Sequence, residues 1–175
     1  MTTATLQEIL ADKTIKAKTK TEMISNLLLS GKIGMKELVT LAGDSKDPAK
    51  ATCIEALEFA SRQQPDVVNL KTFQFVVQSL ASKAPRVKWE SAKVIGNTAR
   101  LFPDKLDDAI KNLLDNTESD GTVVRWSAAF ALGEILKLKT KHNRQLLPAL
   151  EAVCKREVKN SIRKIYLEAM KKIEK

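Results

Sequence analysis

The stretch TVVRWSAAFALGEI, residues 122–135, decides the fold. At 100° per residue its small and aliphatic side chains, among them Val124, Ala128 and Leu132, fall on one side of a helix, as buried helical faces do. Trp126 falls on the opposite side. The stretch therefore predicts an α-helix that is buried along one face and carries a tryptophan on the other.

The same stripe of apolar positions recurs along the chain. It occupies positions i, i+4, i+7, i+8 and i+11, and the four starting residues lie 38, 37 and 38 residues apart. Its members are Ala49, Cys53, Ala56, Leu57, Ala60; Val87, Ser91, Val94, Ile95, Thr98; Val124, Ala128, Ala131, Leu132, Ile135; and Ile162, Tyr166, Ala169, Met170, Ile173. The recurrence in one register predicts a repeat protein.

Each stripe is preceded by another apolar segment that is predicted to be helical. These helices are expected near residues 35–42, 70–81, 106–115 and 144–155. The β-rich sequence TFQFVVQSL, residues 72–80, fits one buried helix within this series. An atypical first pair of helices is expected at residues 3–11 and 21–30.

Two helices per 37–38 residues cannot bury their apolar faces alone, so the units must stack. The predicted fold class is an all-α solenoid of about four two-helix repeats with an N-terminal helical cap. The cap is assigned to residues 1–32. The repeats are assigned to residues 33–65, 66–103, 104–141 and 142–175, together as one domain.

TVVRWSAAFALGEI and PRVKWESAKVIGNTA, residues 85–99, resemble the second helix of a HEAT repeat. The shared pattern is an aliphatic residue, a basic residue, small residues and then Ala-Leu-Gly or Val-Ile-Gly. The resemblance implies a right-handed, armadillo-type superhelix whose second helices line a concave surface. Most HEAT arrays are binding scaffolds for proteins. One HEAT-like branch, the alkylpurine DNA glycosylases, binds DNA, and chromophore lyases also occur among HEAT-like proteins.

Position i+1 is basic in all four repeats and forms what we call the basic ladder: Lys50, Lys88, Arg125 and Arg163. The resemblance implies a structural role, in which an acceptor six positions earlier in one repeat bonds the basic residue of a neighbouring repeat. The acceptor positions hold Asp44, Ser82, Ser119 and Glu157. Ligand binding by the ladder is the alternative.

The outward side of the second helices carries an aromatic and basic face. Trp89 and Trp126 occupy position i+2, Lys93 and Phe130 occupy i+6, and the basic residues at i+13 are Arg62, Arg100, Lys137 and Lys175. Such a face suits a partner protein through tryptophan contacts, nucleic-acid bases through stacking, or a cationic group over a ring. The alternatives are that the tryptophans pack within the stack and that the i+13 cations complement helix dipoles.

Composition limits the class of protein. The chain is 43% hydrophobic and 29% charged, typical of a globular protein, and no apolar run is long enough to span a bilayer. Residues 137–175 hold twelve basic and four acidic residues, so +8 of the net charge of +9 lies there. This charge predicts an acidic partner or a polyanion. A cytoplasmic location with Cys53 and Cys154 reduced is expected.

Signals for catalysis are weak. His142 is expected to be a solvated loop residue, and no phosphate-binding glycine motif or metal-ligand cluster occurs. Glu55 and Glu168, the acids that share position i+6, lie in the outer repeats away from the tryptophans. The prediction is a non-enzymatic adaptor without cofactor, small-molecule substrate or membrane contact, which binds an acidic protein partner. The alternative is a nucleic-acid-binding protein of the HEAT-like type.

Overall fold

The computed structural model describes the backbone of residues 3–174 and the side chains of residues 5–174. In this range the chain forms ten α-helices and two short 3-10 helices. They are α1 (Thr3–Ala11), α2 (Ala17–Leu29), α3 (Met35–Asp44), α4 (Asp47–Gln63), η1 (Pro65–Val67), α5 (Leu70–Ser79), α6 (Pro85–Thr98), η2 (Ala99–Leu101), α7 (Asp107–Asn116), α8 (Thr122–Lys137), α9 (Asn143–Arg156) and α10 (Asn160–Ile173). The predicted all-α class is confirmed, and TFQFVVQSL is helical within α5.

One predicted helix has the wrong start. The second helix was expected at residues 21–30 but begins at Ala17. Its first turn, Ala-Lys-Thr-Lys, has no apolar stripe, so the hydrophobic period does not reveal it. Alanine and lysine nevertheless favour helix, which explains the extra turn.

Proline, asparagine and glycine mark several of the helix ends. A proline lies in the first turn of α4 and of α6, where its missing N–H group costs nothing. The side chain of Asn69 caps α5 by accepting a hydrogen bond from the backbone N–H of Thr72 at 2.9 Å. Gly31 ends α2 with φ of 71°, a left-handed conformation that favours glycine.

The recurring stripe forms the core. Seventeen of its twenty members are buried, and three are partly exposed: Ala49 in the first turn of α4, and Met170 and Ile173 in the last turn of α10. The polar members Ser91 and Thr98 are fully buried too, and Thr98 satisfies its hydroxyl by donating to the backbone oxygen of Val94 at 2.7 Å. Cys53 and Cys154 are free thiols in this core, as expected.

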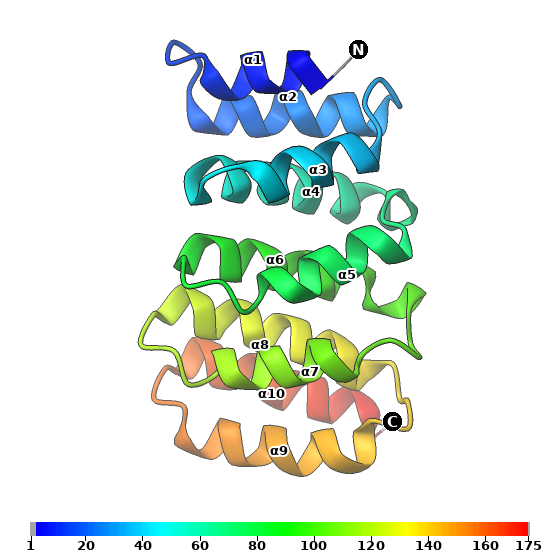
Figure 1. Ribbon diagram of the computed structural model, residues 1–175. Helices are drawn as coiled ribbons and strands as arrows, with labels where there is room; N and C mark the ends of the chain where they lie inside the picture. Colours follow the sequence, from blue (N-terminus) through cyan, green and yellow to red (C-terminus); the bar gives the residue numbers. More distant parts are fainter. Residues whose placement is uncertain (1–2, 175) are drawn as a thin grey trace.

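The helix pairs stack in chain order from α1/α2 to α9/α10 (Figure 1). The second helices α2, α4, α6, α8 and α10 pack on one another in sequence and form the tighter layer. The first helices α3, α5, α7 and α9 form the other layer, which faces the viewer in Figure 1. One apolar core runs through the stack from Leu6 to Ala169.

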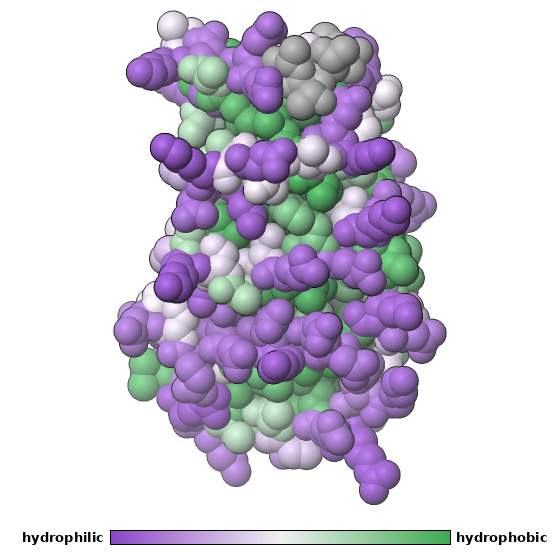
Figure 2. Space-filling model, viewed as in Figure 1, coloured by the Kyte–Doolittle hydropathy of each residue, from purple (hydrophilic) through white to green (hydrophobic). Residues whose placement is uncertain are grey.

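Figure 2 shows hydrophilic side chains over most of the face formed by the first helices, with hydrophobic atoms visible between them. That face is therefore mainly solvated. Within residues 3–174, no helix combines the length and hydrophobicity needed to cross a lipid bilayer.

Candidate partner-binding groove

A groove of about 450 Å³ opens across three second helices. It is lined by Glu58, Phe59 and Arg62 of α4, Lys93 and Asn97 of α6, and Trp126 and Phe130 of α8. We call it the three-helix groove. Because each helix belongs to a different repeat, the groove depends on the register between repeats.

Two residues of α6 shape the groove. The side-chain amide of Asn97 donates to the backbone oxygen of Glu58 at 3.3 Å and to the hydroxyl of Ser61 at 3.2 Å, which ties α6 to α4. Gly96 lies against the ring of Phe130, and a Cβ atom at Gly96 would overlap that ring. The missing side chain lets Phe130 pack closely on α6.

Trp126 is the exposed aromatic residue of the groove. Its exposed fraction is 41%. Its ring is stacked on that of Phe130, with ring centroids 6.0 Å apart and an interplanar angle of 10°. The spacing i, i+4 on α8 places the two rings one turn apart. An exposed, stacked pair of this kind offers a partner a large apolar surface, and the stacked rings lose little conformational freedom on binding.

The structure brings four of the seven predicted face residues together in the groove: Arg62, Lys93, Trp126 and Phe130. Trp89 is half-buried outside it, with its indole Nε1 donating to Glu90 Oε1 at 2.9 Å. Arg100 is exposed on η2, and Lys137 ends α8. Lys175, the last i+13 cation, lies outside the described residues.

Three of the predicted cations are paired with a carboxylate on their own helix. The pairs are Arg62–Glu58 with N–O 3.4 Å, Lys93–Glu90 with N–O 3.0 Å, and Lys137–Glu134. These acids do not stand out in a comparison of equivalent repeat positions, because each lies at a different position of its repeat. The pairing could have been predicted from opposite charges spaced three or four residues apart on each helix.

The pairing sets the electrostatic character of the groove. Arg62 also lies over the ring of Phe59, with its guanidinium carbon 4.8 Å from the ring centroid, while 60% of its side chain stays exposed. Glu58 and Glu90 are buried beside their cations. The groove is therefore amphipathic and nearly charge-balanced, rather than a basic channel.

Burial raises the pKa of Glu90, and the nearby Glu55 raises it further, while the charge and hydrogen bond of Lys93 oppose the shift. A raised folded-state pKa means that ionised Glu90 costs stability. That cost is absent below the unfolded pKa, near 4.5, and grows as the pH rises through the folded pKa.

We expect Glu90→Gln to melt progressively higher than the wild type as the pH rises from 4 to 7.5. Glutamine keeps an acceptor for the Trp89 indole but carries no charge to desolvate. Thermal unfolding of both proteins across this range measures the difference. A pH-independent difference would show that the charge of Glu90 is not its source.

Gly96→Ala should move the Phe130 ring with only a small change in stability. Alanine gains about 1 kcal/mol in helix propensity, whereas crowding costs about 1–3 kcal/mol. Near-ultraviolet circular dichroism should report the displaced ring. The control is Gly43→Ala in α3, where the nearest atom to an added Cβ is Phe75 Cε2 at 3.9 Å, so the aromatic signal should not change.

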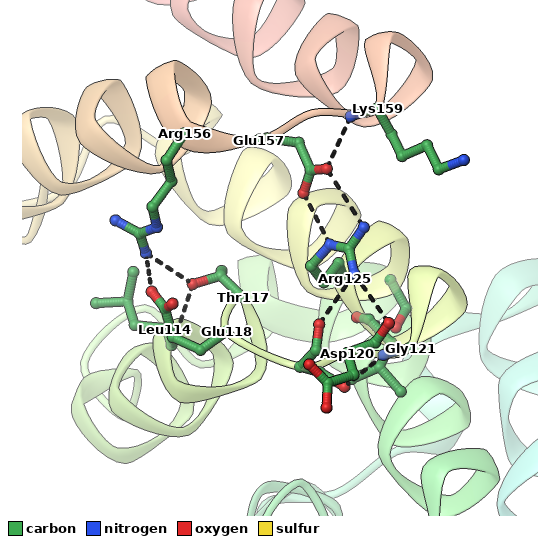
Figure 3. Close-up of polar contacts among 12 residues, drawn as sticks. Leu114, Thr117, Glu118, Asp120, Gly121, Arg125, Arg156, Glu157 and Lys159 are labelled. Carbon is green, nitrogen blue, oxygen red and sulfur yellow. Dashed lines mark hydrogen bonds and ion pairs between the residues drawn. The ribbon is translucent and has the colours of Figure 1, made fainter.

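One residue of the basic ladder, Arg125, joins two repeats (Figure 3). Arg125 of α8 donates through Nε to Glu157 Oε2 at 3.0 Å, and through Nη1 to the backbone oxygens of Ser119 at 3.0 Å and Asp120 at 3.2 Å. Glu157 precedes Arg163 by six positions and belongs to the next repeat, so this contact has the arrangement that the HEAT resemblance implies.

Glu157 is buried at this joint, and its Oε1 accepts a hydrogen bond from the backbone N–H of Lys159 at 2.9 Å. Burial alone would raise the pKa of Glu157. The backbone N–H of Lys159, together with the Arg125 guanidinium, outweighs burial and holds the pKa below its ordinary value. The carboxylate thus remains ionised and links two repeats.

The other ladder residues have different contacts. Lys88 donates to Asn116 Oδ1 of α7 at 3.2 Å, and the ammonium of Lys50 lies 5.4 Å from the centroid of the Phe75 ring. Arg163, in the last repeat, donates to Asn160 of its own helix at 2.6 Å.

The expectation that His142 is solvated is wrong. Its side chain is only 10% exposed, and its Nδ1 lies 3.7 Å from Asp107 Oδ1. The residue precedes α9, and side chains from the start of α9 and from α7 line one pocket, which brings together side chains 35 positions apart. Sequence spacing alone does not show this proximity.

Searches with family models and among curated proteins found no match to this chain. Solved structures with the same architecture do exist. A computationally designed armadillo repeat protein for modular peptide recognition aligns with a TM-score of 0.74 at 16% identity, covering 95% of this chain and 80% of that one.

Two further structures are similar. A designed armadillo repeat protein in complex with the peptide (KR)4 gives a TM-score of 0.73 at 18% identity, covering 98% of this chain and 73% of that one. A chain of the CpcE–CpcF complex of phycocyanin lyase from Nostoc sp. PCC7120 gives a TM-score of 0.72 at 19% identity, covering 95% of this chain and 98% of that one. The protein is thus an α-solenoid with the HEAT and armadillo type of fold. At these identities the likeness concerns the fold alone.

Proposed function

We propose that the protein is a non-enzymatic scaffold that binds a segment of a partner protein in the three-helix groove. The observation that carries the proposal is the exposed Trp126, stacked on Phe130 in a hollow built from three repeats. Large aromatic residues in such positions dominate the energetics of protein recognition.

The charges of the groove favour a protein segment over nucleic acid. A phosphate backbone needs unpaired cations to replace its counterions. Here Arg62 and Lys93 already face Glu58 and Glu90. A peptide with both apolar and polar side chains matches this balance better. The basic C-terminal repeat, residues 137–175, carries the charge that would favour an acidic partner.

The similar solved structures agree with this type of use. One of the designed armadillo proteins holds a peptide, and CpcE and CpcF form a complex with each other. Solenoids present such extended surfaces because their repeats stack in one direction.

The proposal is tested by selecting peptides from a random display library on the wild-type chain. Binding is then measured by fluorescence of a Trp89→Phe variant, in which Trp126 is the single tryptophan. Selected peptides should shift the Trp126 emission to shorter wavelength as the ring leaves water. An eight-nucleotide DNA that gives a salt-sensitive change, with no peptide giving one, would favour the nucleic-acid alternative instead.

A further inference from the structure

A second, larger hollow of about 700 Å³ lies at the C-terminal end of the stack, between α9 and α10. We call it the end groove. It is lined by the apolar side chains of Cys154, Leu167 and Met170, by the polar Asn160, and by three cations and one acid: Lys155, Arg163, Lys164 and Glu151. None of these residues lines the three-helix groove.

The repeat pattern shows what kind of surface this is. Leu167 occupies position i+5, which in the three preceding repeats holds Ile54, Ala92 and Ala129. Those three are at most 1% exposed, whereas Leu167 is 53% exposed. In the earlier repeats the next second helix packs on the preceding one. Leu167 is thus an exposed apolar side chain at a repeat position whose equivalents are buried.

The positive charge around the end groove favours a partner of negative charge. Residues 137–175 carry a net charge of +8, and residues 1–32 carry five basic and three acidic residues, a net charge of +2. Two copies joined end to end would bring like charges together, which disfavours association. A helix with acidic flanks would meet Lys155 and Lys164 favourably.

We infer that the end groove binds an amphipathic helix of a partner protein, whose apolar ridge covers Leu167 and Met170 and whose Asp and Glu residues face the surrounding lysines. This contact is independent of the proposed function of the three-helix groove, which lies on other helices.

The thiol of Cys154 provides an internal probe of occupancy. Cys154 is 7% exposed at the end groove, whereas Cys53 is 0% exposed. Burial raises the pKa of both thiols, that of Cys53 to about 12, while the charge of Arg163 opposes the shift at Cys154. A small thiol reagent applied to the folded chain should therefore modify Cys154 first. A bound helix should protect it, and Cys154→Ser identifies the site of modification.

The test uses two synthetic peptides of about 18 residues, or five helical turns. One carries a leucine ridge flanked by glutamates, and its twin carries lysines in place of the glutamates. The acidic peptide should bind the full chain and slow modification of Cys154. Leu167→Glu should weaken binding at least tenfold. Val123→Glu, which changes a residue 51% exposed on α8 that lines neither groove, should leave it unchanged.

Several results would overturn the inference. The lysine twin could bind as well as the acidic peptide, or neither peptide could protect Cys154. The chain could instead form a dimer that Leu167→Glu dissociates in sedimentation, or bind phosphatidylserine vesicles through Leu167 without binding the peptide. Trp126→Ala should not affect the acidic peptide, so failure of one groove is distinguishable from failure of the other.

Discussion

Arg125→Met should lower the free energy of unfolding by about 3 kcal/mol, because it leaves the buried Glu157 carboxylate without its main partner. The side chain of Glu157 is 4% exposed and that of Arg125 is 16% exposed, so water can compensate little. Methionine keeps the packing of the aliphatic stem. Urea denaturation at pH 7 measures the loss.

The pH dependence identifies the cause. Because the folded-state pKa of Glu157 is lowered, the wild type gains stability from the ionised carboxylate above pH 4.5 and loses it as the pH falls through the folded pKa. Arg125→Met should lose the part of this gain that Arg125 supplies and keep the part from the backbone N–H of Lys159, so the difference in stability between the two proteins should shrink in acid. The control is Arg163→Met, at the same ladder position, which should cost under about 1 kcal/mol since the side chain of Arg163 bonds Asn160 of its own helix. Equal losses in the two variants would contradict the interpretation.

Trp126→Ala should reduce the affinity for selected peptides by about 30-fold, equivalent to about 2 kcal/mol, as central aromatic contacts do. The free energy of unfolding should fall by less than about 1.5 kcal/mol, because a large part of the ring is already in water. Isothermal titration and urea denaturation of the same preparations separate the two effects.

The matched control is Val123→Ala, an exposed apolar residue on the same helix that does not line the groove. It should change neither quantity appreciably. A loss of several kcal/mol of stability in Trp126→Ala would instead identify the ring as a core residue and remove the basis for the groove. Unchanged peptide affinity would place the binding surface elsewhere.

Most of the fold could be predicted from the sequence because the signal was repeated. A single stripe such as Val124–Ala128–Leu132 is compatible with many helical folds. Four copies in one register allow only a stack, and the burial of the stripe confirms it. The start of α2 at Ala17 could not be predicted in this way, because an exposed helical turn has no apolar period.

The groove was predictable in outline and not in detail. The outward position of Trp126 and Phe130 follows from helical geometry alone. The role of Gly96 does not, because it depends on how closely α8 approaches α6. The burial of His142 likewise depends on contact between two repeats. Side-chain neighbours from different repeats require the distance between helices, which a one-dimensional pattern does not contain.

The assembly of the three-helix groove from three successive repeats has an evolutionary consequence. Each helix pair packs mainly on the pairs directly before and after it. Duplication of one 37–38-residue unit inside the gene would therefore lengthen the proposed binding surface by one helix without disturbing the existing contacts between repeats. In such a protein, the length of the bound segment can change through the number of repeats, while the residues within each repeat stay the same.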